Sequence, residues 1–180
     1  MRLKKYLILP ITLAVVLTQT ACPRPTQSQL DQAAKASRSM AQYTNDGINA
    51  VRIAYEEGVI DIKLKDRLAD GFLVVAKGGQ AFNSLVKQVS ELYGDGTVPV
   101  SQWQALDASF SDNVVRPFLD LLQSASGLSG EKSAKIRAII AGLRTAVLVI
   151  SEVFGKRATL ERKVDRIELA LGERRNLCLA

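Results

Sequence analysis

Residues 136–154 have the sequence IRAIIAGLRTAVLVISEVF, the most apolar helical pattern of the chain. Their large apolar side chains recur every three or four residues, at Ile136, Ile139, Ile140, Leu143, Val147, Ile150 and Phe154. This spacing places them on one face of an α-helix. Because residues 146–150 are all apolar, we expect this helix to lie centrally in the fold.

Two long segments near the start of the chain show the same periodicity. The first spans about residues 29–57, and we expect it to begin at a capping box formed by Thr26 and Gln29. The second spans about residues 61–93, with Asp61 as its predicted N-cap. The pair Gly78-Gly79 within it indicates a kink or a tight crossing with a neighbouring helix.

A third segment follows a glycine-rich loop, and a short one ends the pattern. The third is predicted to open at a capping box formed by Ser101 and Gln104. Pro117 lies inside its pattern, so we expect a kink or a break near Arg116. The last helical pattern covers about residues 159–171.

These patterns predict an all-α fold. No stretch alternates apolar and polar residues for long enough to indicate a sheet. Helices joined by short loops pack antiparallel. We therefore expect an up-down bundle of about four long helices plus a short C-terminal amphipathic helix.

The first 22 residues, MRLKKYLILPITLAVVLTQTAC, have a different character. A basic start precedes an apolar run from Tyr6 to Leu17. That run of about a dozen residues is too short to span a hydrocarbon layer of about 30 Å. A basic start, a short apolar core and the small residue Ala21 are typical of a secretory signal peptide.

The junction of Ala21 and Cys22 resembles the cleavage box of bacterial lipoproteins. The resemblance covers these 22 residues, and it implies that the leader is cut before Cys22. It also implies that the Cys22 thiol carries a diacylglyceryl group, that acyl chains such as palmitate anchor the protein, and that Cys22 becomes the mature N-terminus. Pro23, where an Asp would signal inner-membrane retention, implies the periplasmic leaflet of the outer membrane for a Gram-negative source. An ordinary cleaved signal and an uncleaved anchor remain alternatives.

The chain therefore divides into four parts. Residues 1–21 are the lipoprotein-type signal peptide, and residues 22–29 form a tether with two prolines that favour extended geometry. Residues 30–155 form the helical bundle. Residues 156–180 form a basic amphipathic helix and tail.

The formal charge of +6 is unevenly distributed. Residues 22–180 contain 21 basic and 18 acidic side chains, whereas residues 22–155 contain 14 of each. The excess therefore lies in residues 156–180. The candidates for contact with a membrane or a partner are Lys156, Arg157, Arg162, Lys163 and Arg166. The acidic residues interleaved among them favour the alternative, a solvated helix face with i,i+4 ion pairs.

Signals for chemistry are weak. Histidine is absent, which excludes histidine-dependent catalysis and histidine metal ligands. If Cys22 is lipidated, Cys178 has no partner within the chain and lies in the C-terminal tail. Acidic pairs such as Asp66 and Asp70 alternate with basic residues and indicate a solvated face. We expect no enzyme activity, no cofactor and no metal, and the small basic region without aromatic residues argues against nucleic-acid binding.

Two hypotheses for function remain. The first is a non-enzymatic envelope lipoprotein, a helical structural or protein-interaction module with a protein partner in the envelope. The alternative is an exported binding protein for an apolar ligand, which requires a cavity between helices lined by Phe72, Phe82, Trp103 and Phe110.

Overall fold

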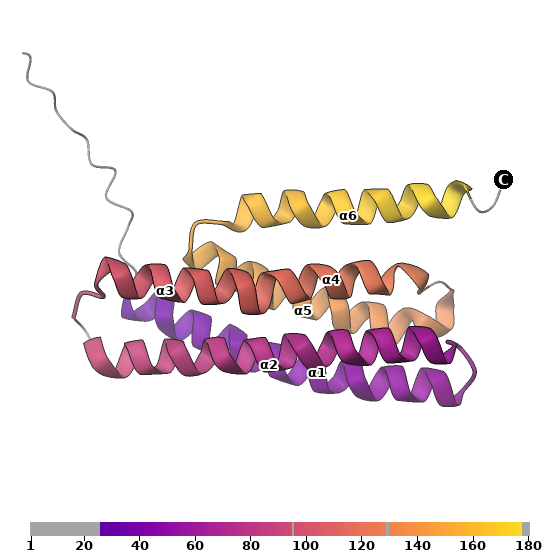
Figure 1. Cartoon of the computed structure of the whole chain (residues 1–180), viewed down its shortest axis with the longest axis horizontal. Coiled ribbons are helices and arrows are strands. Elements are labelled where there is room, and N and C mark those ends of the chain that lie inside the picture. Colours follow the sequence, from indigo (N-terminus) through magenta and orange to yellow (C-terminus); the bar gives the residue numbers. More distant parts are fainter. Residues whose placement is uncertain (1–25, 95, 129, 178–180) are drawn as a thin grey trace, which may run out of the picture.

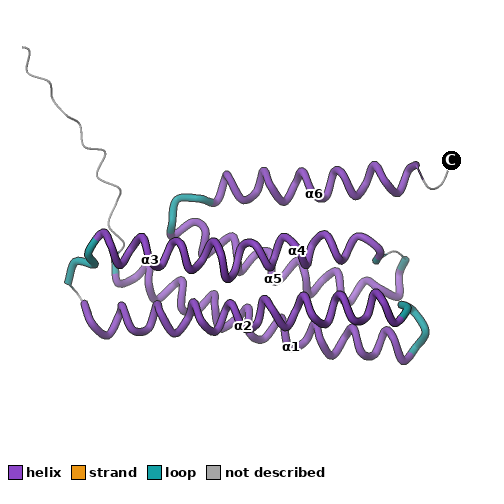
Figure 2. The backbone as a smooth tube through the Cα atoms, viewed as in Figure 1, coloured by secondary structure: helices purple, strands orange, loops and turns teal. Residues whose placement is uncertain are grey.

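The computed structural model describes residues 26–94, 96–128 and 130–177, and within them every regular element is helical (Figures 1 and 2). The helices are α1 (Gln27–Glu56), α2 (Ile62–Tyr93), α3 (Val100–Phe110), α4 (Arg116–Ser124), α5 (Ala134–Val153) and α6 (Arg157–Leu177). A π-helical turn, Ser111–Val115, joins α3 to α4, and two short 3-10 turns lie between α4 and α5. The predicted all-α fold is confirmed.

Four long segments run side by side, and α6 forms an outer layer (Figure 1). The segments are α1, α2, the joined α3 and α4, and α5. α1 packs most extensively against α2 and α5, while α2 also packs against α4 and the π turn. α6 packs against α5 and α4. Its Leu160 and Val164 are buried in the same hydrophobic core as the rest of the bundle.

The apolar stripe of residues 136–154 lies on α5 and the residue that follows it. Leu143, Val147 and Ile150 are fully buried, while Ile139 and Phe154 are partly buried against the core. α5 packs on α1 and also carries α6, so the helix joins the bundle to its outer layer.

Four aromatic rings pack together in one cluster. The Phe110 ring lies 5.4 Å from Phe82 and 5.3 Å from Phe154, measured between ring centroids. The Trp103 ring stacks on Phe154 at 4.4 Å. Because these residues come from α2, from α3 and from the residue that follows α5, the cluster holds three segments together.

Two of the three predicted helix starts are confirmed. The Thr26 backbone N–H donates to Gln29 Oε1 at 2.8 Å, and the Gln29 N–H donates to Thr26 Oγ1 at 3.3 Å, which completes the capping box. The Leu64 N–H donates to Asp61 Oδ1 at 2.7 Å at the start of α2.

The predicted capping box at Ser101 and Gln104 is wrong. α3 begins two residues earlier, at Val100, with Pro99 at the N-cap position and no side-chain cap. Ser101 is therefore the second residue of the helix and cannot act as its N-cap. The C-terminal helix is also longer than predicted, since α6 spans Arg157–Leu177.

Pro117 distorts the third segment without breaking it. A proline has no N–H, so the Asn113 carbonyl cannot receive the usual α-helical hydrogen bond from residue 117. The chain forms the π turn directly before this point, where the Arg116 N–H donates to the Ser111 carbonyl. The disturbance expected near Arg116 is thus a π turn, a recognised cause of local helix distortion.

The π turn lies directly against Gly78 of α2. A Cβ atom at Gly78 would overlap the Asn113 carbonyl group, so only glycine allows the two backbones to approach this closely. A Cβ at Gly71, two turns earlier in α2, would lie 2.9 Å from Leu121 Cδ1 of α4. The tight crossing predicted from Gly78-Gly79 is confirmed at Gly78.

We expect Gly78→Ala to destabilise the fold by about 1–3 kcal/mol, because the added methyl group would push α2 from the π turn. Gly79→Ala is a matched control, since a Cβ there meets Met40 Cε at an ordinary 3.6 Å and alanine has the higher helix propensity. Urea denaturation measures the free energy of unfolding of both variants. Equal effects of the two substitutions would contradict the close approach at Gly78.

Leu143→Ala should cost about 2–5 kcal/mol in the same measurement, because it opens a cavity at a fully buried position of α5. Leu73→Ala on α2 removes the same atoms from a residue that is 43% exposed, so its cost should be clearly smaller. A cost below about 1 kcal/mol for Leu143→Ala would show that α5 does not belong to the core.

Candidate functional site

The predicted lipidation junction, Ala21 and Cys22, lies outside the described residues, as does Cys178. The described chain begins at Thr26, the N-cap of α1. α1 and α6 both begin in the same half of the bundle, on the left in Figure 1. In the sequence, Cys22 precedes the N-cap of α1 by four residues.

The helices of the described residues are not membrane spans. None of them is both long enough and apolar enough to cross a bilayer.

The basic residues singled out in the sequence all belong to α6 or to the turn before it. α6 is seated by Leu160 and Val164, which are buried, and by Ile167, which is half-buried. The seat lies on α5 and α4. Ion pairs beside this apolar stripe and at the start of α6 add to these contacts.

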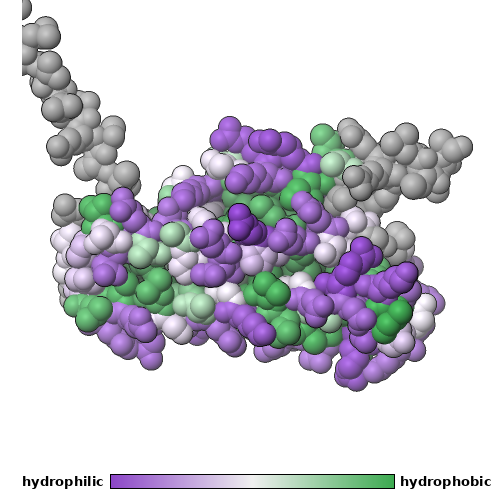
Figure 3. All heavy atoms as spheres, in the orientation of Figure 1, coloured by the Kyte–Doolittle hydropathy of each residue, from purple (hydrophilic) through white to green (hydrophobic). Residues whose placement is uncertain are grey.

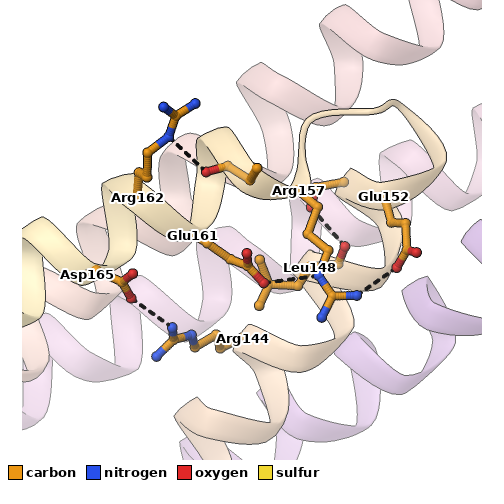
Figure 4. Close-up of polar contacts among 9 residues, drawn as sticks. Arg144, Leu148, Glu152, Arg157, Glu161, Arg162 and Asp165 are labelled. Carbon is orange, nitrogen blue, oxygen red and sulfur yellow. Dashed lines mark hydrogen bonds and ion pairs between the residues drawn. The ribbon is translucent and has the colours of Figure 1, made fainter.

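Arg144 of α5 holds one side of α6 (Figure 4). Its Nη1 donates to both carboxylate oxygens of Glu168, at 2.9 and 3.1 Å, and its Nη2 donates to Asp165 Oδ1 at 3.1 Å. The Arg144 side chain is only partly exposed. Two acidic residues of α6 therefore face α5.

Three further ion pairs lie at the start of α6. Arg157 lies between Glu152 and Glu161, at 2.8 and 3.0 Å (Figure 4). Hydrogen bonds to Glu161 and then Glu152 raise the pKa of the Arg157 guanidinium above its ordinary value. Lys156 Nζ lies 2.6 Å from both oxygens of Asp107 on α3.

Arg162, Lys163 and Arg166 are placed differently from Lys156 and Arg157. All three are exposed, and none of them forms an ion pair within the described part of the chain. The Arg162 Nε donates to the Ala158 carbonyl of its own helix at 3.1 Å (Figure 4). The structure thus divides the five predicted contact residues into two that are engaged in ion pairs and three that are free to meet something else.

The charges of α6 alternate along the sequence but separate around the helix. The sequence pattern favoured a solvated face with i,i+4 pairs, and Arg157 with Glu161 is one such pair. Asp165 and Glu168, however, pair with α5 across a long sequence separation. The exposed basic side chains of Arg162, Lys163 and Arg166 therefore lie on a different part of the helix surface from Asp165 and Glu168.

The four aromatic residues proposed to line a ligand cavity do not surround one space. Phe82, Phe110 and Trp103 pack with Phe154 in the aromatic cluster. Phe72 lies instead against Gly47 of α1, whose missing side chain makes room for the ring.

A surface groove of about 550 Å³ lies between α4 and α6. Leu119, Leu160 and Ile167 contribute apolar lining, and both acidic and basic side chains stand at its edges. Among the aromatic residues predicted to form a cavity, Phe110 alone lines this groove.

Three site residues escaped the sequence analysis, namely Asp107, Arg144 and Glu152, which pair with α6. Arg144 had a signal, since it is the only charged side chain between residues 138 and 151. A single charge within an apolar helical segment indicates a polar partner on a neighbouring element. Asp107 and Glu152 had no comparable signal.

Neither a search for metal ligands in the described part of the chain nor the comparisons with known proteins identify a further site. Within the described residues, no three His, Cys, Asp or Glu side chains are grouped to hold a metal ion. Compared with protein-family models, curated proteins and solved structures, the chain gave no match.

We expect Arg144→Met to loosen α6 selectively, because the substitution keeps the length of the side chain and removes both ion pairs. Amide hydrogen exchange of α6 should accelerate, while exchange in α1 and α2 stays unchanged. The total loss of stability should be below about 1 kcal/mol, as the pairs are partly exposed.

Arg52→Met is the matched control for this experiment. It removes an exposed i,i+4 pair with Glu56 within α1 and should leave α6 exchange unchanged. Unaltered α6 exchange in Arg144→Met would show that the ion pairs do not hold the helix.

Proposed function

We propose that this protein is a non-enzymatic envelope lipoprotein, a helical structural or protein-interaction module attached to a membrane through lipidated Cys22. The observation that carries the proposal is the order of features in residues 1–22: a basic start, a short apolar run, then Ala21 and Cys22. Two or more acyl chains anchor a protein stably, whereas a single chain does not. For a Gram-negative source, Pro23 supports the periplasmic leaflet of the outer membrane.

The short link between Cys22 and the bundle is consistent with this proposal. α1 is capped at Thr26, so only residues 23–25 separate the cysteine from the capping residue. Two of these are prolines, which favour an extended chain of about 3.1 Å per residue. A lipid on Cys22 would hold the bundle within about 15 Å of the membrane surface.

The body of the protein supports a structural or interaction role. The aromatic residues predicted to line a ligand cavity pack against each other or against a neighbouring helix. Asp107, Glu152 and Asp165 form ion pairs that join α6 to α3 and α5. These carboxylates have a structural task, since each neutralises a cation on a different element.

Intact mass and membrane fractionation test the anchor. When the full chain is expressed in a bacterial host, we expect a mature protein that begins at Cys22, carries added acyl mass and sediments with membranes. Cys22→Ser should abolish both the added mass and membrane association. Cys178→Ser is the matched control and should change neither.

An unmodified chain in the periplasm would contradict the proposal. It would indicate ordinary signal cleavage, with Gln19 preventing recognition of the lipidation box, because these boxes usually carry leucine at that place. A membrane-bound chain that retains residues 1–21 would indicate an uncleaved anchor instead.

A further inference from the structure

We propose that the outer face of α6, formed by Arg162, Lys163, Arg166 and Leu169, binds the anionic lipid headgroups of the membrane to which the protein is anchored. The inference deepens the proposed function and rests on it for the presence of a membrane beside the bundle.

The outer face follows from the helical positions of α6. Successive residues are about 100° apart around an α-helix. With Leu160 and Val164 directed into the core, Asp165 and Glu168 fall on the flank that faces Arg144 of α5. The three basic residues fall on the opposite flank and the outer surface.

The basic residues of this face have no competing partner. The side chains of Arg162, Lys163 and Arg166 form no ion pair among the described residues, whereas Asp165 and Glu168 of α6 pair with Arg144 of α5. Figure 3 shows mostly hydrophilic side chains along the top of the molecule, with some hydrophobic ones among them. The ion pairs of Arg144 therefore do more than hold α6, because they partly neutralise Asp165 and Glu168 beside its outer face.

Leu169 gives the face an apolar component. Its side chain is 65% exposed, although it belongs to a helix whose other large apolar residues with described side chains are buried or half-buried. Around the helix it lies between Arg162 and Asp165, and Arg166 precedes it by three residues, about one turn. An exposed leucine flanked by basic side chains is typical of helices that lie in a membrane interface.

The predicted tether brings this face to the membrane. α1 and α6 begin in the same half of the bundle, and α6 is its outer layer (Figure 1). From Arg157 to Arg166 the helix rises about 14 Å. Only three residues separate Cys22 from the N-cap of α1, so a lipid on Cys22 would keep this half of the bundle near the membrane surface.

Vesicle sedimentation tests the proposal without the lipid anchor. The protein is the chain from residue 22 with Cys22→Ser, which contains the complete described core, from Leu30 to Val164. The vesicles are phosphatidylcholine, with or without phosphatidylglycerol. We expect binding to the anionic vesicles, weakened by salt, and much less to the neutral ones.

A triple glutamine variant removes the charges of the outer face: Arg162→Gln, Lys163→Gln and Arg166→Gln. Each basic residue near an anionic surface contributes about 1 kcal/mol, so the partition coefficient should fall about 100-fold. The control removes three exposed charges from α1 and α2: Lys35→Gln, Arg38→Gln and Lys77→Gln. Circular dichroism confirms that both triple variants are folded.

The two triple variants decide between a local face and a general charge effect. A large loss for the α6 variant with a small loss for the control supports the proposal. Equal losses, or the absence of binding to anionic vesicles, overturn it, and the latter result would direct attention to an acidic protein partner. In the Leu169→Trp variant, the fluorescence of the added tryptophan should shift to shorter wavelength on anionic vesicles and be quenched by brominated phosphatidylglycerol. Unchanged fluorescence would contradict membrane contact at this residue.

The outcome is separate from that of the anchoring experiment. The vesicle assay uses a protein without acyl chains, whereas intact mass reports lipidation of Cys22. Lipidation without vesicle binding removes only the present inference. Vesicle binding without lipidation removes only the proposed anchor.

Discussion

The close approach between Gly78 of α2 and the π turn at Asn113 determines where the second half of the bundle lies. A side chain at residue 78 would overlap the Asn113 carbonyl group, so the geometry depends on a hydrogen atom at that position. Leu121 of α4 lies near Gly71 in a similar way two turns along α2. These contacts fix α4, and α6 rests on α4 and α5. The candidate contact surface on α6 is therefore positioned by a backbone contact in the core.

α6 is the least supported layer of the bundle. Its described side chains contribute Leu160 and Val164 to the buried core, while ion pairs with Asp107, Arg144 and Glu152 hold its start and one flank. Partly exposed ion pairs each contribute about 1 kcal/mol or less. Local opening of such an element requires less free energy than global unfolding. The same ion pairs orient the helix, since they attract its acidic flank to α5.

Much of the fold was predictable because it depends on local patterns. The capping box at Thr26 and the N-cap at Asp61 use side chains within one helical turn, and both are confirmed. Gly78 and Pro117 each indicated a disturbance at the right place. The form of that disturbance, a π turn seated on a glycine, depends on two segments that are distant in sequence. The start of α3 was missed because a serine inside the first helical turn resembles one at its N-cap.

The sequence identified which residues of the candidate site are basic, but it did not show which of them form ion pairs. The sequence identified Lys156, Arg157, Arg162, Lys163 and Arg166 as a basic group. It did not show that Lys156 and Arg157 are paired, because Asp107 lies far along the chain and Glu152 belongs to the preceding helix. The roles of Ala21 and Cys22 stay predictions from the leader sequence. The acidic residues appeared to dilute the positive charge, but Asp165 and Glu168 form ion pairs with Arg144 on the flank of α6 that lies beside α5.

The orientation of the anchored protein tests the account most directly. A spin label at Ala170→Cys would lie on the exposed side of α6, and one at Asn45→Cys on the exposed side of α1, each with Cys178→Ser so that lipidated Cys22 leaves a single free thiol. In anionic vesicles, power-saturation measurements compare contact with lipid-soluble oxygen and with a water-soluble nickel complex. The account predicts that residue 170 lies at the headgroup level and residue 45 in water. Equal exposure of both labels to water would contradict it.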